Sequence, residues 1–220
     1  MTSETVAKHV VRGQYFAGTV NGENREGYRQ EERVSSKSNV ETFVAVKLFI
    51  DNWRWSGVPF YLRTGKNLPY SASEVRVQFR PTPNVLFAAQ DDLDLQANAL
   101  TLRLQPDERI SLRFNGKVPG NSIETRPVRM HFGYDAEFGA YTPEAYERLL
   151  LEAMAGDATL FIRRDEVETA WQIVDDIRAG WGETPLSNHE FYAAGTWGPV
   201  AAEDLLAADN HLWHIPVPAK

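Results

Sequence analysis

The sequence contains no cysteine among its 220 residues. This absence excludes disulfides, thiolate metal sites and a cysteine nucleophile. The chain also lacks an apolar run of transmembrane length and the apolar core of a signal peptide. Basic residues are not in excess, because the formal net charge is −7, which disfavours a general binder of nucleic acid or of anionic membranes. We therefore expect a soluble, cytoplasmic protein with no nucleic-acid and no membrane partner.

Several sequence motifs of enzymes are missing as well. No GxGxxG follows a strand-like segment, so the chain has no Rossmann fingerprint for a dinucleotide, and no GxSxG marks a serine nucleophile. The five histidines show no metal-ligand spacing, so we expect no metal site.

The amino-acid composition is typical of a well-packed protein. Hydrophobic residues make up 43% of the chain and aromatic residues 11%, with six tryptophans. This composition argues against disorder, and the length allows one large domain or two small ones.

Sheet patterns occupy the middle of the chain. Residues 40–50 and 58–63 are typical of strands, and four later segments alternate apolar with polar residues. In those four segments one face is apolar and the other carries Arg, Gln, Thr and Ser: 74–80, 99–105, 109–114 and 126–132. A sheet with one packed and one polar face is typical of antiparallel strands.

Helix patterns come mainly after the strands. We expect helices from Thr142-Pro143-Glu144 to Gly156, from Asp165 to near Gly180, and over 201–208. Before the strands, residues 1–15 read as the end of a polar helix running into an extended segment, and 16–38 as a long exposed loop. The order predicts an α+β fold: a large, mostly antiparallel sheet with helices packed on one face.

The segment Arg63-Thr64-Gly65-Lys66 is a candidate phosphate site. Glycine permits a close backbone approach, and lysine presents a mobile point charge. The spacing is not that of a P-loop, because Asn67 follows the lysine. The alternative interpretation is a hairpin turn with a solvated lysine.

A row of arginines on the polar sheet face is a second candidate site. Arg63, Arg76, Arg103 and Arg113 fall on successive predicted strands, where they would grip an anionic ligand or simply form salt bridges on an exposed face. The aromatic segment 53–60 favours packing in a core or an interface.

Seven blocks of sequence together resemble glucose-6-phosphate dehydrogenases. The blocks keep their order and spacing over nearly all of the chain: VRGQY at 11–15, ETFVA at 41–45, NWRWSGVPFYLRTGK at 52–66, RLQP at 103–106, AYERL at 145–149, GDATLF at 156–161 and GTWGP at 195–199. The resemblance covers only the C-terminal, substrate-binding and dimerisation domain of a bacterial-type enzyme. It implies that residues 1–220 are this domain and that the N-terminal Rossmann coenzyme domain is absent from the chain.

The resemblance implies an oxidoreductase of glucose metabolism. Such an enzyme oxidises glucose 6-phosphate to 6-phosphogluconolactone with NADP in the pentose phosphate pathway, and it works as a homodimer joined through the sheet. The family's catalytic His–Asp pair and its HYLGK-type substrate motif precede the VRGQY block, and nothing in this chain matches them. We therefore expect the isolated chain to be inactive and assign it no catalytic residue.

Few site residues carry over by resemblance. Lys66 matches the lysine that binds glucose 6-phosphate, and Gln105 matches a glutamine of the same site, whereas Ser71 replaces a second basic residue and weakens phosphate binding. Arg63, Arg76 and Arg103 match arginines that hold a second, structural NADP in some relatives, and Arg113 replaces a lysine there. Three departures count against that nucleotide site: Ala72, Ser111 and Arg129.

Two other functions remain open from the sequence. One is a stand-alone, non-enzymatic assembly or binding module that pairs with a dehydrogenase subunit. The other is a sensor of phosphate ligands that uses the Lys66 loop.

Overall fold

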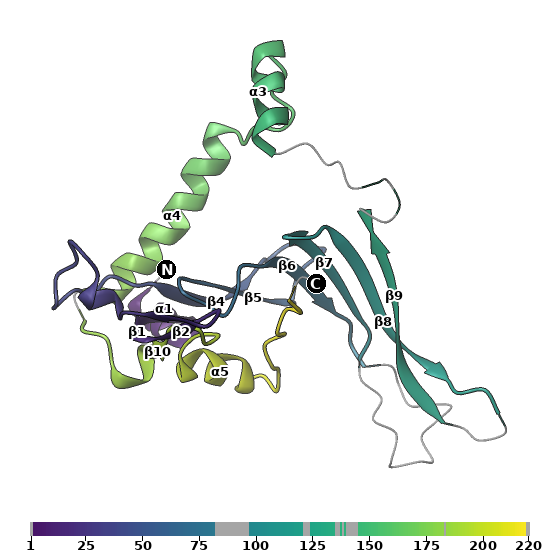
Figure 1. The fold of residues 1–220 in the computed structure, drawn as a ribbon, viewed down its shortest axis with the longest axis horizontal. Coiled ribbons are helices and arrows are strands. Elements are labelled where there is room, and N and C mark those ends of the chain that lie inside the picture. Colours follow the sequence, from purple (N-terminus) through teal and green to yellow (C-terminus); the bar gives the residue numbers. More distant parts are fainter. Residues whose placement is uncertain are drawn as a thin grey trace. The chain divides into compact units, whose positions relative to one another are not determined.

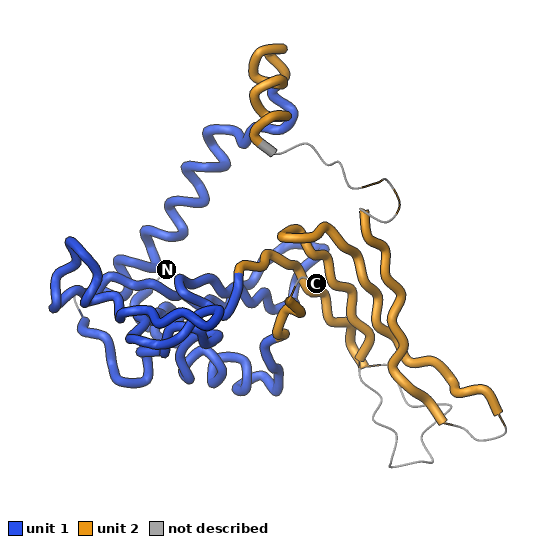
Figure 2. Tube along the Cα trace, in the orientation of Figure 1, with its two compact units in different colours: residues 1–70, 158–213 blue, residues 71–157, 214–220 orange. Residues whose placement is uncertain are grey.

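The computed structural model describes residues 2–81, 97–120, 124–134, 137, 139, 145–182 and 184–218. These residues form two compact units, coloured separately in Figure 2. The first unit joins Met1–Tyr70 to Ala158–Trp213, and the second joins Ser71–Asp157 to His214–Lys220. The chain therefore passes between the units three times.

The first unit is built on a four-stranded sheet in the order β10-β1-β4-β5 (Figure 1). Strand β1 (Val10–Phe16) pairs antiparallel with β4 (Phe43–Phe49), and β4 pairs antiparallel with β5 (Pro59–Gly65). Strand β10 (Phe191–Ala193), from far along the chain, pairs parallel with β1. The predicted strands over 40–50 and 58–63 are confirmed with shifted ends.

Helices lie on both faces of this first sheet. On one face α5 (Val200–Ala207) contributes to a core with Tyr15, Phe43, Ala45, Tyr192 and Ala194. On the other, α1 (Ser3–His9) and α4 (Arg164–Trp181) build a second core. The start of the chain is packed against α4, because a Cβ added to Gly180 would lie 2.5 Å from Cγ2 of Val6.

Residues 16–38 carry more structure than the sequence analysis predicted. Strands β2 (Gly18–Val20) and β3 (Glu23–Arg25) form a hairpin, and a 3₁₀ turn η1 follows at Tyr28–Gln30. The prediction of a structureless loop is wrong here, because Asn21-Gly22 adopts positive φ angles of 51° and 83° and forms a tight two-residue turn. The fully buried Gln14 attaches the end of this segment to β1, since its Nε2 donates to the carbonyls of Ser38 and Val40.

The second unit contains a four-stranded antiparallel sheet in the order β6-β7-β8-β9. Its strands are β6 (Ser73–Gln78), β7 (Ala99–Gln105), β8 (Arg109–Lys117) and β9 (Thr125–Gly133). The register aligns Arg76, Thr101, Ser111 and His131 on one face and Val77, Leu100, Leu112 and Met130 on the other. The predicted division into a polar and an apolar face is therefore confirmed.

The α+β class is also confirmed, but the described strands divide between two four-stranded sheets and the β2–β3 hairpin and do not form the one large sheet expected from the sequence. Helix α3 (Ala145–Ala155) ends at Gly156, whose φ is 72°, as predicted. Its predicted start at Thr142 to Glu144 lies outside the described residues. The prediction of core packing is wrong for Trp53, which is fully exposed. The ring of Trp55 lies edge-on to that of Phe60, with 5.3 Å between the two ring centres.

Candidate functional site

The backbone of Lys66 is fixed at both of its polar groups. Its N–H donates to the carbonyl of Thr42 at 2.8 Å, and its carbonyl accepts from the hydroxyl of Tyr192 at 2.8 Å. The side chain itself is exposed. The turn after β5 therefore presents a solvent-facing ammonium group from a well-anchored backbone.

Packing explains the glycine that precedes this lysine. A Cβ on Gly65 would lie 2.7 Å from Cδ2 of Phe43 and 3.2 Å from Cδ2 of Leu68. Gly198, with a φ of 116°, lies against the same ring, because its Cβ would be 2.4 Å from Cε2 of Phe43. The two glycines therefore leave room for one buried phenyl ring.

The residue after the lysine completes the turn. Asn67 has a φ of 48°, a region that asparagine tolerates better than most residues. Its carbonyl accepts from the N–H of Gly195 at 2.7 Å. Two stretches distant in sequence, one at Thr42 and one from Tyr192 to Gly195, thus hold the backbone on either side of the Lys66 side chain.

Thr42 and Tyr192 were not predicted from the sequence as partners of Lys66. Tyr192 is 126 residues from Lys66, so no local pattern connects them. Burial raises the pKa of Tyr192, which keeps its hydroxyl protonated and able to donate.

Gln105 is the last residue of β7, in the second unit. It is exposed and pairs with Ser73 of β6, next to a shift in strand register. Lys66 and Gln105 thus belong to different units.

The predicted arginine row is divided between the two sheets. Arg63 lies on β5 of the first sheet, where its guanidinium carbon is 4.9 Å from the ring centre of Trp197 and 4.7 Å from that of Trp213. Arg76, Arg103 and Arg113 lie on β6, β7 and β8 of the second sheet. This division was not predicted, because the same alternation of apolar and polar residues runs through the strands of both sheets.

The buried Arg103 is surrounded by acceptors of its own unit. It contacts Glu74 at 3.4 Å and Asp107 at 3.1 Å, and it donates to the carbonyl of Val217. The C-terminal segment of the chain is therefore attached to β7 through this side chain.

His214 connects the same C-terminal segment to β6. Its Nδ1 is 3.3 Å from Nη1 of Arg76, and its Nε2 is 3.1 Å from Oε1 of Glu74. Burial, followed by the charges of Arg76 and three other arginines, lowers the pKa of His214 to about 4. A neutral ring fits these contacts, because Nδ1 accepts from Arg76 while Nε2–H faces the carboxylate.

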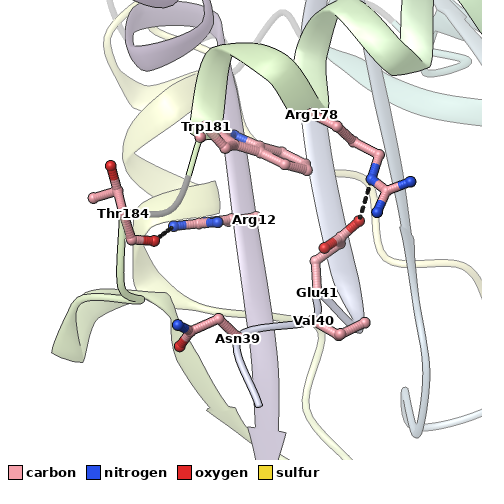
Figure 3. A pocket seen from close by; sticks show the side chains of 8 residues that line it. Arg12, Asn39, Val40, Glu41, Arg178, Trp181 and Thr184 are labelled. Atoms are coloured by element: carbon pink, nitrogen blue, oxygen red, sulfur yellow. Dashed lines mark hydrogen bonds and ion pairs between the residues drawn. The ribbon is translucent and has the colours of Figure 1, made fainter. Parts of the chain in front are cut away.

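A separate pocket of about 540 Å³ lies in the first unit (Figure 3). Its lining includes Arg12, Glu41, Arg178, Trp181 and Thr184. Arg12 is already engaged: it donates to the carbonyl of Thr184, contacts Glu190 at 3.4 Å and lies 5.5 Å from the ring centre of Trp181. Arg178 pairs with Glu41 at 3.7 Å. These contacts give the pocket a structural role, namely joining β1 to the segment after α4.

The described part of the chain offers neither a membrane span nor a metal centre. None of its helices is both long and apolar enough to cross a bilayer. Within those same residues, no group of three or more His, Asp or Glu side chains is arranged to ligate a metal.

Comparison with known proteins places the chain in a family. A family model described as "Glucose-6-phosphate dehydrogenase, C-terminal domain" matches residues 1–214. The glucose-6-phosphate 1-dehydrogenase of Treponema pallidum (strain Nichols) is 46% identical over 219 residues, which cover 98% of this chain and 42% of that protein. The enzyme of the same name from Aggregatibacter actinomycetemcomitans is 44% identical, with the same coverage. The chain thus spans about two fifths of the length of these relatives.

Solved structures agree with the sequence comparison. The crystal structure of glucose-6-phosphate 1-dehydrogenase from Mycobacterium avium superposes with a TM-score of 0.76 at 32% identity, covering 99% of this chain and 44% of that one. A glucose-6-phosphate dehydrogenase in complex with glucose 6-phosphate gives a TM-score of 0.78 at 30% identity, covering 97% and 44%. The fold and the near-complete family match lead to one conclusion: the chain belongs to the glucose-6-phosphate dehydrogenase family, as its C-terminal domain.

Proposed function

We propose that this chain is the substrate-binding and dimerisation part of an NADP-dependent, cytoplasmic glucose-6-phosphate dehydrogenase of the pentose phosphate pathway. The observation that carries the proposal is the anchored Lys66 turn, within a chain whose family match covers residues 1–214. The reaction is the oxidation of glucose 6-phosphate at C1 to 6-phosphogluconolactone. When bound, NADP supplies the hydride acceptor, and the coenzyme domain that binds it lies outside this chain.

The groups of this chain act by binding and orientation. The ammonium of Lys66 carries the positive charge that a phosphate or a sugar hydroxyl requires, and the amide of Gln105 offers both a donor and an acceptor. Holding the sugar phosphate in one orientation lowers the entropic part of the barrier without any proton transfer by these groups. The proton of the C1 hydroxyl therefore passes to a base outside this chain.

A nuclear magnetic resonance titration of the ¹⁵N-labelled chain with glucose 6-phosphate tests substrate binding. We expect the Lys66 and Gln105 amide signals to shift at millimolar ligand, and Lys66→Gln to weaken binding several-fold. Exposed Lys37 is the matched control, so Lys37→Gln should leave the affinity unchanged. Ser71→Arg should strengthen binding. A titration without shifts, or one that Lys66→Gln leaves unaltered, would contradict the proposal.

The isolated chain should produce no NADPH. The test is a spectrophotometric assay of the purified chain at saturating glucose 6-phosphate and NADP. Turnover that stays with the protein through every purification step would contradict this part of the proposal. The reading frame upstream of residue 1 separates the enzyme from the alternative of a non-enzymatic module. A Rossmann fingerprint there favours the enzyme, and its absence favours the module.

For Arg63, Arg76 and Arg103, a structural role is favoured over a structural NADP site. Each of the three already contacts groups of its own unit. Arg63 lies over two indole rings, and Arg76 contacts His214. Arg103 binds two carboxylates and a carbonyl. A nucleotide phosphate would have to displace these partners. Titration with NADP, followed through the Arg76 and Arg103 side-chain signals, should therefore show no saturable change below millimolar ligand.

We also propose a homodimer formed through the second sheet. Its support is the apolar face of that sheet, on which Val75, Val77, Val128 and Met130 are exposed among the described residues. An exposed apolar sheet face of this kind is typical of an interface. Light scattering after size exclusion should give a dimer mass, and Met130→Glu should shift it toward a monomer. A monomeric wild-type chain would contradict this proposal alone.

A further inference from the structure

The hydroxyl of Tyr192 is the centre of a small buried network beneath Lys66. It lies 2.8 Å from the carbonyl of Lys66, 3.2 Å from the carbonyl of Thr42 and 3.1 Å from the Thr42 hydroxyl. The carbonyl of Thr42 also accepts the N–H of Lys66. One tyrosine and one threonine therefore bind both polar groups of the lysine's backbone, and they also bind each other.

The position of Tyr192 is itself firmly determined. Its side chain is only 3% exposed, and its ring lies 5.5 Å from that of Phe43 and 6.2 Å from that of Tyr15. Its strand, β10, pairs with the inner strand β1, with Tyr192 opposite Tyr15. Because a packed interior leaves little free volume, the hydroxyl cannot move far without disturbing the core.

We propose that Tyr192 is a positioning residue for Lys66 in sugar-phosphate binding, acting through the Lys66 carbonyl rather than touching the ligand. The inference rests on the proposed function. A lysine ammonium is carried on four rotatable methylenes, so its location depends on how well its own backbone is fixed. By donating a hydrogen bond to the Lys66 carbonyl, Tyr192 fixes the backbone of Lys66 and reduces the volume in which its ammonium group moves. Less orientational freedom then has to be lost when the anion binds.

The hydroxyl, not the ring, is the essential part of this device. Phenylalanine keeps the packing against Phe43 and Tyr15 but leaves the Lys66 carbonyl without its donor. A single neutral hydrogen bond is worth a modest free energy, so Tyr192→Phe should fold and should change the affinity rather than abolish it. The expected change is about two- to tenfold in the dissociation constant.

Tyr61→Phe is the matched control. Tyr61 lies on β5, five residues before Lys66, and its hydroxyl donates to Oδ2 of Asp209 at 2.5 Å. The substitution therefore removes a tyrosine hydroxyl from the same unit without touching the Lys66 turn. Any effect of lost stability alone appears in both variants, whereas loss of positioning appears only in Tyr192→Phe.

The experiment measures two quantities by nuclear magnetic resonance on the full chain: the hydrogen-exchange rate of the Lys66 amide and the dissociation constant for glucose 6-phosphate. We expect Tyr192→Phe to accelerate exchange at Lys66 and to weaken binding about two- to tenfold, with Tyr61→Phe close to wild type in both. Binding that is unchanged in Tyr192→Phe, or equally weakened in Tyr61→Phe, overturns the positioning role. A wild-type chain that does not bind glucose 6-phosphate overturns the proposed function, and the inference with it.

Discussion

Replacing Gly65 with alanine places a methyl group 2.7 Å from Cδ2 of Phe43 and 3.2 Å from Cδ2 of Leu68. Carbon atoms at van der Waals contact are about 3.5–4.0 Å apart. Phe43 is among the largest fully buried side chains, and Gly198 also lies against its ring, so the ring has no free space to enter. Overpacking of this kind costs about 1–3 kcal/mol of folding free energy.

The clash with one identified ring makes the cost testable by a double-mutant cycle. Phe43→Leu removes part of the ring and should cost about 1–2 kcal/mol on its own, by comparison with larger truncations of buried aromatic residues. In the double variant, the methyl group introduced by Gly65→Ala occupies space that the ring has vacated. The double variant should therefore lose less folding free energy than the two single variants together, with a coupling of about 1 kcal/mol or more.

Urea denaturation of the four proteins, followed by circular dichroism, gives the required free energies. Gly133→Ala is the control, because a Cβ at Gly133 meets nothing within 4 Å and should be neutral or slightly stabilising. Additive costs in the cycle, or a Gly65→Ala variant as stable as wild type, would refute the argument that this glycine is set by Phe43.

Three further changes test contacts elsewhere in the chain. The pKa of His214 is lowered to about 4, and its side chain is 31% exposed. The folded chain therefore binds fewer protons at this residue than the unfolded chain, so the free energy of unfolding should decrease as the pH falls from 6.5 to 4. The loss at pH 5 should be about 1–2 kcal/mol after allowance for solvent screening, and His214→Gln should flatten the dependence of the urea midpoint on pH; a slope that persists contradicts it. Arg63→Gln removes two cation–π contacts and should cost about 1–2 kcal/mol while changing the fluorescence of Trp213; an unaltered spectrum and midpoint would count against it. Asp209→Asn leaves the half-buried ammonium of Lys47 without its carboxylate and should cost about 1–3 kcal/mol in urea denaturation, whereas no loss would mean that this pair is not stabilising.

The strands of the second sheet were predictable because their signal is local. Alternation in 74–80, 99–105, 109–114 and 126–132 depends only on which neighbours face inward, and the pairing register agrees with it. The helix from Arg164 to Trp181 was predictable for the same reason, since its apolar stripe lies within one segment, although the residue that caps it is Gly182 and the predicted end was near Gly180.

Pairings between distant segments were not predictable from one sequence. The parallel pairing of β10 with β1 and the bond from Tyr192 to Lys66 join residues more than a hundred positions apart. The helical coverage of both sheet faces depends on such pairings too. The hairpin at Asn21-Gly22 is a different case, because its turn signal was present and was outweighed by the polar composition around it.

The site shows the same division. The exposed Lys66 after a strand and a glycine was recognisable from the segment itself, whereas the reason for the glycine lies in Phe43, and the anchoring of the lysine lies in Thr42 and Tyr192. The partners of Arg103 include Val217, 114 residues away, which no spacing rule connects to it.

The pairing of β1 with β10 has a consequence for the order of events during synthesis. Tyr15 is made 177 residues before its strand partner Tyr192. At a translation rate of about 5–20 residues per second, β1 waits roughly 9–35 s for that neighbour. All four strands of the second sheet are completed within this interval. The nascent chain therefore carries an unpaired edge on β1 throughout this interval, and the segment that closes this edge is the same one that brings Tyr192 beneath Lys66.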